Sequence, residues 1–407
     1  MKRSIFIPAQ HAAMRVRKNA LMLTVALFTA AFGLVSCSDD NDDNGTTVEE
    51  ENYVEQKLQG MTLHEKICQM IFSRPETFID VNDSGYVLSP KNHAVTSWSS
   101  TAQSMYDKYP VGGIILFAHN IVDESQLTSF NSILHGLDGH PMLCVDEEGG
   151  RVARIANNDA FGLTKYESAY SLGSEGDYDK VWSAAQYIGS YVKKYGFDVD
   201  FAPVADVWTN AENTVIGKRA FSSNPDTVAI CAWTFYSGLA SQGIQGCYKH
   251  FPGHGDTSAD THYGYADANK TWEEMLACEM IPFKYGIDHG IQMIMTAHVR
   301  TPNVTSDSLP ATLSKELLTG KLRGELGYQG LIIADGLEMG AITNQYTVEE
   351  VAVKTVQAGI DIILLPASLP KAVAALKKAV ANGEITESRI DESVRRILTM
   401  KHNMGLI

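Results

Sequence analysis

Residues 249–262, with the sequence KHFPGHGDTSADTH, carry side chains that can bind and move protons. This segment holds three histidines and two aspartates within 14 residues. Asp260 lies two residues before His262, so its carboxylate can accept from one ring nitrogen and fix the tautomer, and the other nitrogen can then transfer a proton. Gly253 and Gly255 permit backbone conformations that other residues disfavour. A polar surface loop would have a similar composition, and that alternative stays open on this segment alone.

A metal site is a second interpretation of the same segment. His250, His254 and His262 could supply imidazole ligands to zinc. Two histidines four residues apart present their rings on one face only in a helix, and Pro252 and Gly253 break a helix between them. We therefore expect neither a metal nor a cofactor in this protein.

The reactive groups need a rigid scaffold, and eight short apolar runs are typical of strands buried on both faces of a parallel sheet. The runs lie at 67–72, 113–117, 142–145, 198–202, 245–249, 292–296, 331–334 and 360–364. Amphipathic stretches between and after them predict helices at 179–195, 227–242, 272–286, 314–324, 347–358, 369–381 and 390–401. This alternation predicts an α/β fold, a (β/α)8 TIM-like barrel in a single domain. An open doubly wound sheet is the alternative, but no strand is followed by a phosphate-binding G-x-G-x-x-G sequence.

Polar residues follow several of these runs at the point where each strand should end. Asp146 follows the third run, Asp206 the fourth, Lys249 ends the fifth, His298 follows the sixth and Asp335 the seventh. Catalytic groups of (β/α)8 enzymes sit at the carboxyl ends of the strands. We therefore expect one polar active site at that end of the barrel, with residues 75–104 as a long loop at its rim.

Five segments resemble motifs of one enzyme family, and they occur in the family's order. They read VDEEGGRVAR at 145–154, FAPVADV at 201–207, IGKRAF at 216–221, KHFPGHGDTSADTH at 249–262 and IADGLEMGAI at 333–342. On these segments, residues from about 60 to 400 resemble the β-N-acetylglucosaminidases of glycoside hydrolase family 3, in their minimal single-domain form. The resemblance implies retaining hydrolysis of terminal β-linked N-acetylglucosamine, often in peptidoglycan fragments.

The resemblance also implies a role for each matching residue. Asp335 would be the nucleophile, and His262, oriented by Asp260, would be the acid/base. The residues that would bind sugar hydroxyls are Asp146, Arg154, Arg219, Lys249 and His250. The chemistry agrees, since retention needs a carboxylate that attacks the anomeric carbon. A histidine with a pKa of about 6.5 can protonate the leaving oxygen and later deprotonate water near neutral pH.

The amino-terminal residues differ from the rest in composition. Residues 1–36 begin with basic side chains and contain an apolar run of about 16 residues, which is short for a membrane span of roughly 20 and typical of a secretory signal. The end of the run, Leu-Val-Ser-Cys, resembles a bacterial lipobox, which implies cleavage before Cys37 and lipidation of its sulfur. An ordinary signal followed by a chance cysteine is the alternative.

An acidic stretch at residues 37–52 predicts a disordered tether, so that residues 53–407 form the catalytic domain. An acidic stretch directly after a lipidated cysteine also resembles a surface-export signal. We therefore expect secretion across the inner membrane and lipid anchoring in the cell envelope, at the outer membrane. The protein would contact a membrane only through this lipid.

Composition limits the partners. Lys and Arg number 33 against 48 Asp and Glu, a formal net charge of −15, which argues against binding nucleic acid or an anionic membrane surface. A carbohydrate is the expected partner. Three other functions remain open: a family 3 β-glucosidase or β-xylosidase, a β-N-acetylglucosaminide phosphorylase, and a non-catalytic sugar-binding lipoprotein.

Overall fold

The computed structural model describes residues 45–79, 94–257 and 266–407, and the chain divides into two units, residues 1–49 and 50–407. The expected signal at 1–36, Cys37, and the residues Asp260 and His262 lie outside the described residues. The second unit holds all of the described strands, and no described helix is long and apolar enough to cross a membrane.

Parallel strands form the centre of this unit. They are β1 (Ile71–Ser73), β2 (Gly113–Ile115), β3 (Met142–Val145), β6 (Val199–Asp200), β7 (Gln245–Gly246), β8 (Tyr248–Phe251), β10 (Met293–Thr296), β12 (Leu331–Ile333) and β13 (Ile363–Leu364). Two short pairs lie outside this set: β4 (Glu147–Gly149) with β5 (Val152–Ala153), and β9 (Ala266–Asp267) with β11 (Val299–Arg300). The strands are two to four residues long, and nearly all their side chains are buried, as expected of a sheet covered on both faces.

The strands pair in two parallel sets that continue one another. One set runs β13-β1-β2-β3-β6-β7 and the other β12-β10-β8. Only Cys247 separates β7 from β8, so one extended segment passes from the first set to the second. At the other end, a parallel bridge pairs Ile333 with Ile362, and the Ala334 N–H donates to the Ile362 carbonyl over 3.0 Å. The α/β class and the parallel sheet that the sequence predicts are therefore confirmed, and the sheet is curled.

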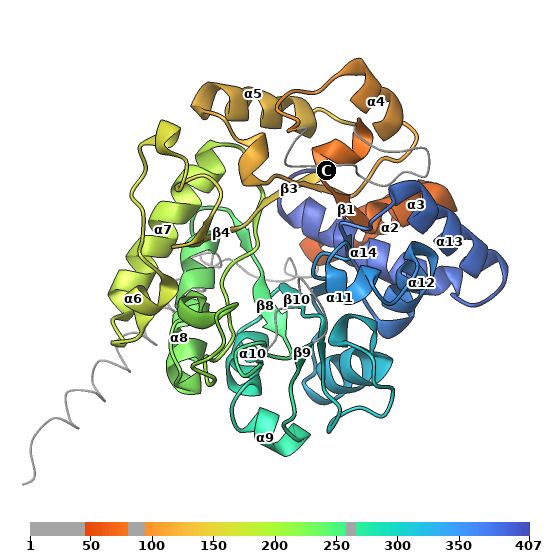
Figure 1. Ribbon diagram of the computed structural model, residues 1–407. Helices are drawn as coiled ribbons and strands as arrows, with labels where there is room; N and C mark the ends of the chain where they lie inside the picture. Colours follow the sequence, from red (N-terminus) through yellow and green to blue (C-terminus); the bar gives the residue numbers. More distant parts are fainter. Residues whose placement is uncertain (1–44, 80–93, 258–265) are drawn as a thin grey trace, which may run out of the picture. The chain divides into compact units, whose positions relative to one another are not determined.

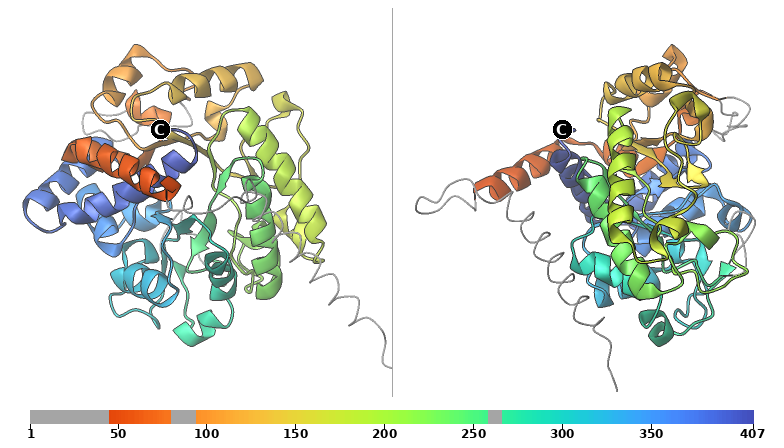
Figure 2. Two further views of the ribbon diagram at one scale, coloured as in Figure 1. Left: turned by 180° about the vertical axis from the view of Figure 1, so that it is seen from behind. Right: turned by 90° about the vertical axis from the view of Figure 1, so that its left-hand side faces the viewer.

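Helices surround the strands in all three views (Figures 1 and 2). They are α2 (Gly45–Gly60), α3 (Leu63–Gln69), α4 (Ser100–Tyr106), α5 (Glu124–His135), α6 (Ala169–Gly173), α7 (Tyr178–Lys194), α8 (Pro225–Ala240), α9 (Trp272–Leu276), α10 (Met280–Asp288), α11 (Gly340–Thr343), α12 (Val348–Ala358), α13 (Leu369–Ala381) and α14 (Glu387–Asn403). Shorter turns are η1 (Pro75–Phe78), η2 (Ala118–Asn120), η3 (Asp159–Phe161), η4 (Gly217–Arg219) and η5 (Ala311–Leu313), and η6 (Glu316–Glu325) is a π-helix. The amphipathic pattern predicted α7, α8, α12, α13 and α14 to within about three residues.

The structure corrects two of the predicted elements. The run at 67–72 was expected to be one strand, but its first half belongs to α3. Thr62 caps that helix and forms a capping box with Glu65, which fixes a helix start just ahead of the apolar run. The predicted helix at 272–286 is divided into α9 and α10, and Pro282 near the start of α10 has no N–H with which to continue a helix from α9.

Residues 45–52 differ from the expected disordered tether, because they form the first turns of α2. Glutamate is a good helix former, so the acidic residues of this stretch do not oppose the helix. Val54 and Leu58, one turn apart, are buried in the core, and this contact explains why the helix forms there. Residues 37–44 lie outside the described residues, so the tether expected there stays a prediction.

A buried lysine makes the stability of the fold depend on pH. Lys401 in α14 is fully buried, and its Nζ donates to Gln69 Oε1 over 2.7 Å and to the Gly139 carbonyl over 2.8 Å. Burial lowers the pKa of Lys401 to about 7, although Asp198 opposes the shift. An exposed lysine has a pKa of about 10.4, so between pH 7 and 10 the unfolded chain binds the extra proton and stability rises with pH.

We expect Lys401→Met to remove this dependence. Between pH 7.5 and 9, the free energy of unfolding of the wild type should rise by about 2 kcal/mol relative to the variant. Urea denaturation at the two pH values measures the difference. If the free energy of unfolding changed equally in wild type and variant between these pH values, Lys401 would be charged in the folded protein over this range.

Candidate active site

The residues expected in the site follow neighbouring parallel strands. Asp146 directly follows β3, Lys249 and His250 lie in β8, and His298 and Asp335 follow β10 and β12. Since the carboxyl ends of parallel strands lie along one rim of the sheet, these residues are all found at that rim. The residues that the sequence placed at strand ends do lie at the ends of parallel strands, and their role in a site stays a prediction.

Lys249 lies at the centre of a buried ionic network. Only 2% of its side chain is exposed, and its Nζ contacts Asp146 Oδ1 at 2.8 Å and Glu148 Oε1 at 2.7 Å. Arg219 donates to both Glu148 oxygens, over 2.8 Å from Nε and 2.7 Å from Nη2. Arg154 Nη2 lies 3.4 Å from the second Asp146 oxygen. The structure therefore brings together Asp146, Arg154, Arg219 and Lys249, which lie far apart in the sequence.

The network favours the charged forms of Asp146, Glu148 and Lys249. Burial opposes ionisation of Glu148, but Arg219 and Lys249 hold the pKa of its carboxyl far below the usual value. Burial likewise opposes ionisation of Asp146, and Lys249 and Arg154 lower its pKa. The two carboxylates raise the pKa of Lys249 despite its burial. Charged groups held in fixed positions can form strong hydrogen bonds to ligand hydroxyls without a large reorganisation cost.

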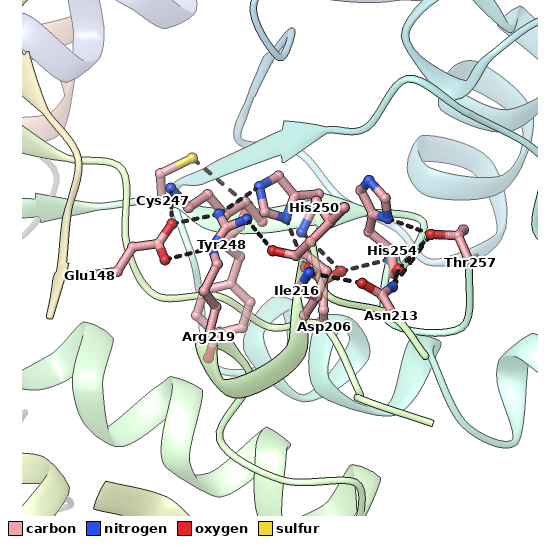
Figure 3. A network of polar contacts seen from close by, with 12 residues as sticks. Glu148, Asp206, Asn213, Ile216, Arg219, Cys247, Tyr248, His250, His254 and Thr257 are labelled. Carbon is pink, nitrogen blue, oxygen red and sulfur yellow. Dashed lines mark hydrogen bonds and ion pairs between the residues drawn. The ribbon is translucent and has the colours of Figure 1, made fainter. Parts of the chain in front are cut away.

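His250 is oriented by a buried aspartate. Its Nδ1 lies 2.7 Å from Asp206 Oδ2, and the other Asp206 oxygen accepts the backbone N–H of His250 over 3.3 Å and of His254 over 2.7 Å (Figure 3). Burial opposes ionisation of Asp206, but His250 lowers its pKa. An ionised carboxylate can only accept, so Nδ1 carries the proton, and Nε2 lies 3.4 Å from Arg219 Nη2.

Close packing fixes the backbone from Lys249 to Thr257. Gly253 has a φ of +114°, and a Cβ at Gly255 would come within 1.9 Å of the Val207 carbonyl oxygen, so both positions require glycine. Asn213 donates to the His254 carbonyl over 2.7 Å. The described part of the segment ends at Thr257, so Asp260 and His262 lie just beyond it.

Asp335 is partly buried next to two histidines. Its Oδ1 accepts the Gly336 N–H over 2.7 Å. Burial opposes ionisation of Asp335, but His298 and His250 lower its pKa. His298 Nε2 lies 3.0 Å from the Gly336 carbonyl oxygen, and its Nδ1 lies 2.9 Å from Thr312 Oγ1, so the segment that carries Asp335 is held in place. This arrangement provides a fixed, ionised carboxylate.

The sequence reasoning missed Arg74 and its partners. Arg74 follows β1, is 5% exposed and forms an ion pair with Glu338, three residues after Asp335. Its guanidinium lies 4.8 Å from the centre of the Phe117 ring, and that of Arg154 lies 5.8 Å from the same ring. The rule that polar residues follow strands would have found Arg74, had it been applied to the first run.

Two further features bear on ligands. A cleft of about 360 Å³ opens beside Arg219. Its other lining residues are Gly149, Arg151, Glu167, Ser168, Trp208, Ala211, Asn213, Thr214, Gly217 and Lys218. Among residues 45–79, 94–257 and 266–407, no group of three or more His, Cys, Asp or Glu side chains is arranged to hold a metal ion. Within this range, His250 and His254 each direct Nδ1 to a protein partner, Asp206 and Thr257 respectively.

An ionised carboxylate thus lies near a buried set of charged donors, at one rim of a parallel α/β fold. Residues 62–400 match the glycosyl hydrolase family 3 N-terminal domain, and the chain belongs to this family. The family that the sequence motifs indicated is thereby confirmed.

Similar proteins are named beta-hexosaminidase or beta-N-acetylglucosaminidase. It is 32% identical to beta-hexosaminidase A of Pseudoalteromonas piscicida over 340 residues, which cover 76% of this chain and 56% of that protein. It is 34% identical to beta-hexosaminidase LpqI of Mycobacterium tuberculosis over 315 residues, 74% of this chain and 79% of that protein. A solved family 3 beta-N-acetylglucosaminidase from Paenibacillus sp. str. FPU-7 superposes with a TM-score of 0.77 at 34% identity, over 85% of this chain and 63% of that one.

Proposed function

We propose that this protein is a retaining exo-β-N-acetylglucosaminidase that removes terminal β-linked N-acetylglucosamine. The observation that carries the proposal is the buried network around Lys249 beside the ionised carboxylate of Asp335. Two curated relatives are named beta-hexosaminidase and a solved relative is named beta-N-acetylglucosaminidase, which supports an N-acetylated sugar as substrate.

In the proposed mechanism, Asp335 attacks the anomeric carbon and forms a covalent glycosyl-enzyme, which water then hydrolyses with net retention. The contacts that lower its pKa support this role, since the nucleophile must be ionised. The residues that we assign to the sugar hydroxyls are Asp146, Arg154, Arg219, Lys249 and His250. They are anchored to one another, so they bind the sugar in one orientation and present its anomeric carbon to Asp335.

We assign the proton transfer to His262, oriented by Asp260. In the sequence, the two residues come shortly after His254 and Gly255, which are held by contacts with Thr257 and Val207. Histidine can donate a proton to the leaving oxygen and later accept one from water. Both residues lie outside the described residues, and their assignment rests on the sequence motif.

Replacing His262 with alanine should slow glycosylation according to the leaving group. We expect kcat/KM to fall roughly a hundredfold or more for a poor leaving group such as an alkyl alcohol, and by less than about tenfold for dinitrophenol, which needs no proton. Rates across a series of aryl leaving groups measure this. Equal losses for all leaving groups would rule out the acid role.

A direct assay of substrate class tests the proposed function. The purified enzyme is compared on aryl β-glycosides that differ only at C2, the 2-acetamido compound against the glucoside and the xyloside. We expect kcat/KM to favour the 2-acetamido substrate by at least roughly a hundredfold. Preference for the glucoside or xyloside would assign the chain to those activities, sugar 1-phosphate formed in phosphate buffer would make it a phosphorylase, and binding without turnover would make it a sugar-binding protein.

We infer that the curled sheet closes into the (β/α)8 barrel that the sequence predicts. Support comes from the bridge between Ile333 and Ile362 and from that between Val204 and Lys249, which join the two sets of strands at both ends. The closed order is then β1, β2, β3, β6, β7 with β8, β10, β12 and β13. Closure explains why residues from β3 and β12 can contribute to one site.

We also propose that Cys37 is lipidated and anchors the enzyme in the cell envelope. The support is the sequence alone, an apolar leader that ends in Leu-Val-Ser-Cys. Replacing Cys37 with serine should move the enzyme from the membrane fraction to the soluble fraction and abolish labelling by a fatty acid, without loss of activity per molecule. Membrane retention of the unlabelled variant would overturn the anchor.

A further inference from the structure

Glu147 lies between two residues of the ionic network but points away from it. It is completely buried and belongs to β4, where successive side chains alternate in direction. Asp146 and Glu148, on either side of it, both contact Lys249. The sequence motif that contains it gave no separate role to this position.

Strands β4 and β5 form an antiparallel hairpin, and the carboxylate of Glu147 in β4 binds the backbone just after β5. It accepts the N–H groups of Ile155 and Ala156, each over 2.9 Å, and the hydroxyl of Tyr191 over 2.8 Å. Ile155 and Ala156 directly follow Arg154, which contacts Asp146 on the opposite side of the backbone. One buried side chain therefore ties the segment of Asp146 to the segment of Arg154.

Asp200, the last residue of β6, binds the backbone N–H of Glu147. Its Oδ1 accepts the N–H of Glu147 over 2.9 Å, and it is completely buried. Burial raises the pKa of Asp200 well above the usual value, although the bond from the Glu147 N–H opposes the shift. Since β6 is the parallel neighbour of β3, this bond fixes the backbone of Glu147 against the adjacent strand.

We propose that Glu147, supported by Asp200, is a positioning residue that sets the separation between Asp146 and Arg154 and hence their fit to one sugar ring. The proposal rests on the proposed function, because it takes those two residues to bind the substrate. Glu147 does not touch the sugar and acts only through Arg154 and Asp146. The same backbone hairpin thus carries the binding groups on one face and the group that fixes their spacing on the other.

Glu147→Gln is the principal variant. Glutamine keeps the size but replaces one acceptor oxygen with an amide donor. This donor must face a backbone N–H in either orientation, that of Ile155 at the Oε2 position or that of Ala156 at the Oε1 position, where the Tyr191 hydroxyl also binds. We expect KM to rise roughly tenfold while kcat changes by less than about threefold, since binding contacts are misplaced and Asp335 is not. Tyr191→Phe removes one of the three donors and should raise KM about twofold to threefold, and it covers the case in which Glu147→Gln does not fold.

A double-mutant cycle separates positioning from general damage. Arg154→Ala alone should raise KM, and Glu147→Gln or Tyr191→Phe added to it should raise KM by a smaller factor than in the wild type, because part of their effect passes through the same guanidinium. Asp361→Asn is the matched control, since Asp361 is also a fully buried carboxylate but lies before β13, at the opposite end of the strands. That control should lower the unfolding midpoint and leave KM within about twofold.

The kinetics are measured on the aryl β-glycoside that the wild type cleaves best. A preference for a sugar without the 2-acetamido group would overturn the proposed function, and the variants would still test the positioning role on that sugar. Calorimetric titration with the matching free sugar reports binding without turnover. The positioning role is overturned if Glu147→Gln and Tyr191→Phe leave KM within twofold. It is equally overturned if their effects are unchanged in the Arg154→Ala background.

Discussion

Asp335→Asn should lower kcat/KM on an aryl β-N-acetylglucosaminide by a factor on the order of 10⁴ or more, because it removes the attacking oxygen anion. Asparagine has nearly the same shape and keeps an oxygen that can accept the Gly336 N–H. The free energy of unfolding should therefore change little. Initial rates on the aryl substrate, together with urea denaturation, measure both effects.

The matched control for this variant is Asp288→Asn. Asp288 is an exposed aspartate in α10 that pairs with Lys284 one turn earlier. We expect its activity to stay within twofold of the wild type. Near-normal turnover by Asp335→Asn would assign the nucleophile to another residue.

Lys249→Met should damage both stability and activity. Methionine keeps the length of the chain but leaves Asp146 and Glu148 without the cation that both contact. Removing one partner of a buried ion pair costs about 3–5 kcal/mol, because the remaining charge is uncompensated. We expect a loss of this size in urea denaturation at pH 7, and a fall of at least roughly a hundredfold in kcat/KM.

Two comparisons make this result specific. Lys284→Met removes an exposed cation and should change the free energy of unfolding by less than about 1 kcal/mol. Combining Lys249→Met with Asp146→Asn should recover part of the lost stability, because Asp146 then keeps only the 3.4 Å contact with Arg154, whereas Arg219 still neutralises Glu148. A single variant Lys249→Met as stable as the wild type would mean that Arg154 and Arg219 alone compensate these carboxylates.

Much of the fold could be predicted from the sequence because its strands are short and buried on both faces. Such strands appear as isolated apolar runs, and each of the eight runs overlaps a strand, although the run at 67–72 reaches β1 only with its last two residues. The run at 67–72 was assigned wrongly because a helix end and a strand are adjacent there, and both are apolar. The capping box at Thr62 and Glu65 was the available signal.

The site was predictable at the level of the rim but not of the contacts. Asp146, Lys249 and Asp335 were found because each follows or ends a strand. The bond between His250 and Asp206 joins residues 44 apart, and no local pattern reveals it. The inward direction of Glu147 was hidden for the same reason, since the sequence shows a run of acids and not which way each one points.

Trapping the glycosyl-enzyme is the most direct test of the central claim, which is that Asp335 is the nucleophile of a retaining glycosidase. A fluorinated N-acetylglucosaminide with a good leaving group should accumulate the intermediate, and mass spectrometry of the digested protein should place the sugar on the Asp335 side chain. NMR of the sugar first released from a β-linked substrate should show the β-anomer. A label on any other residue, or an α-anomeric product without a label, would contradict the mechanism proposed for this site.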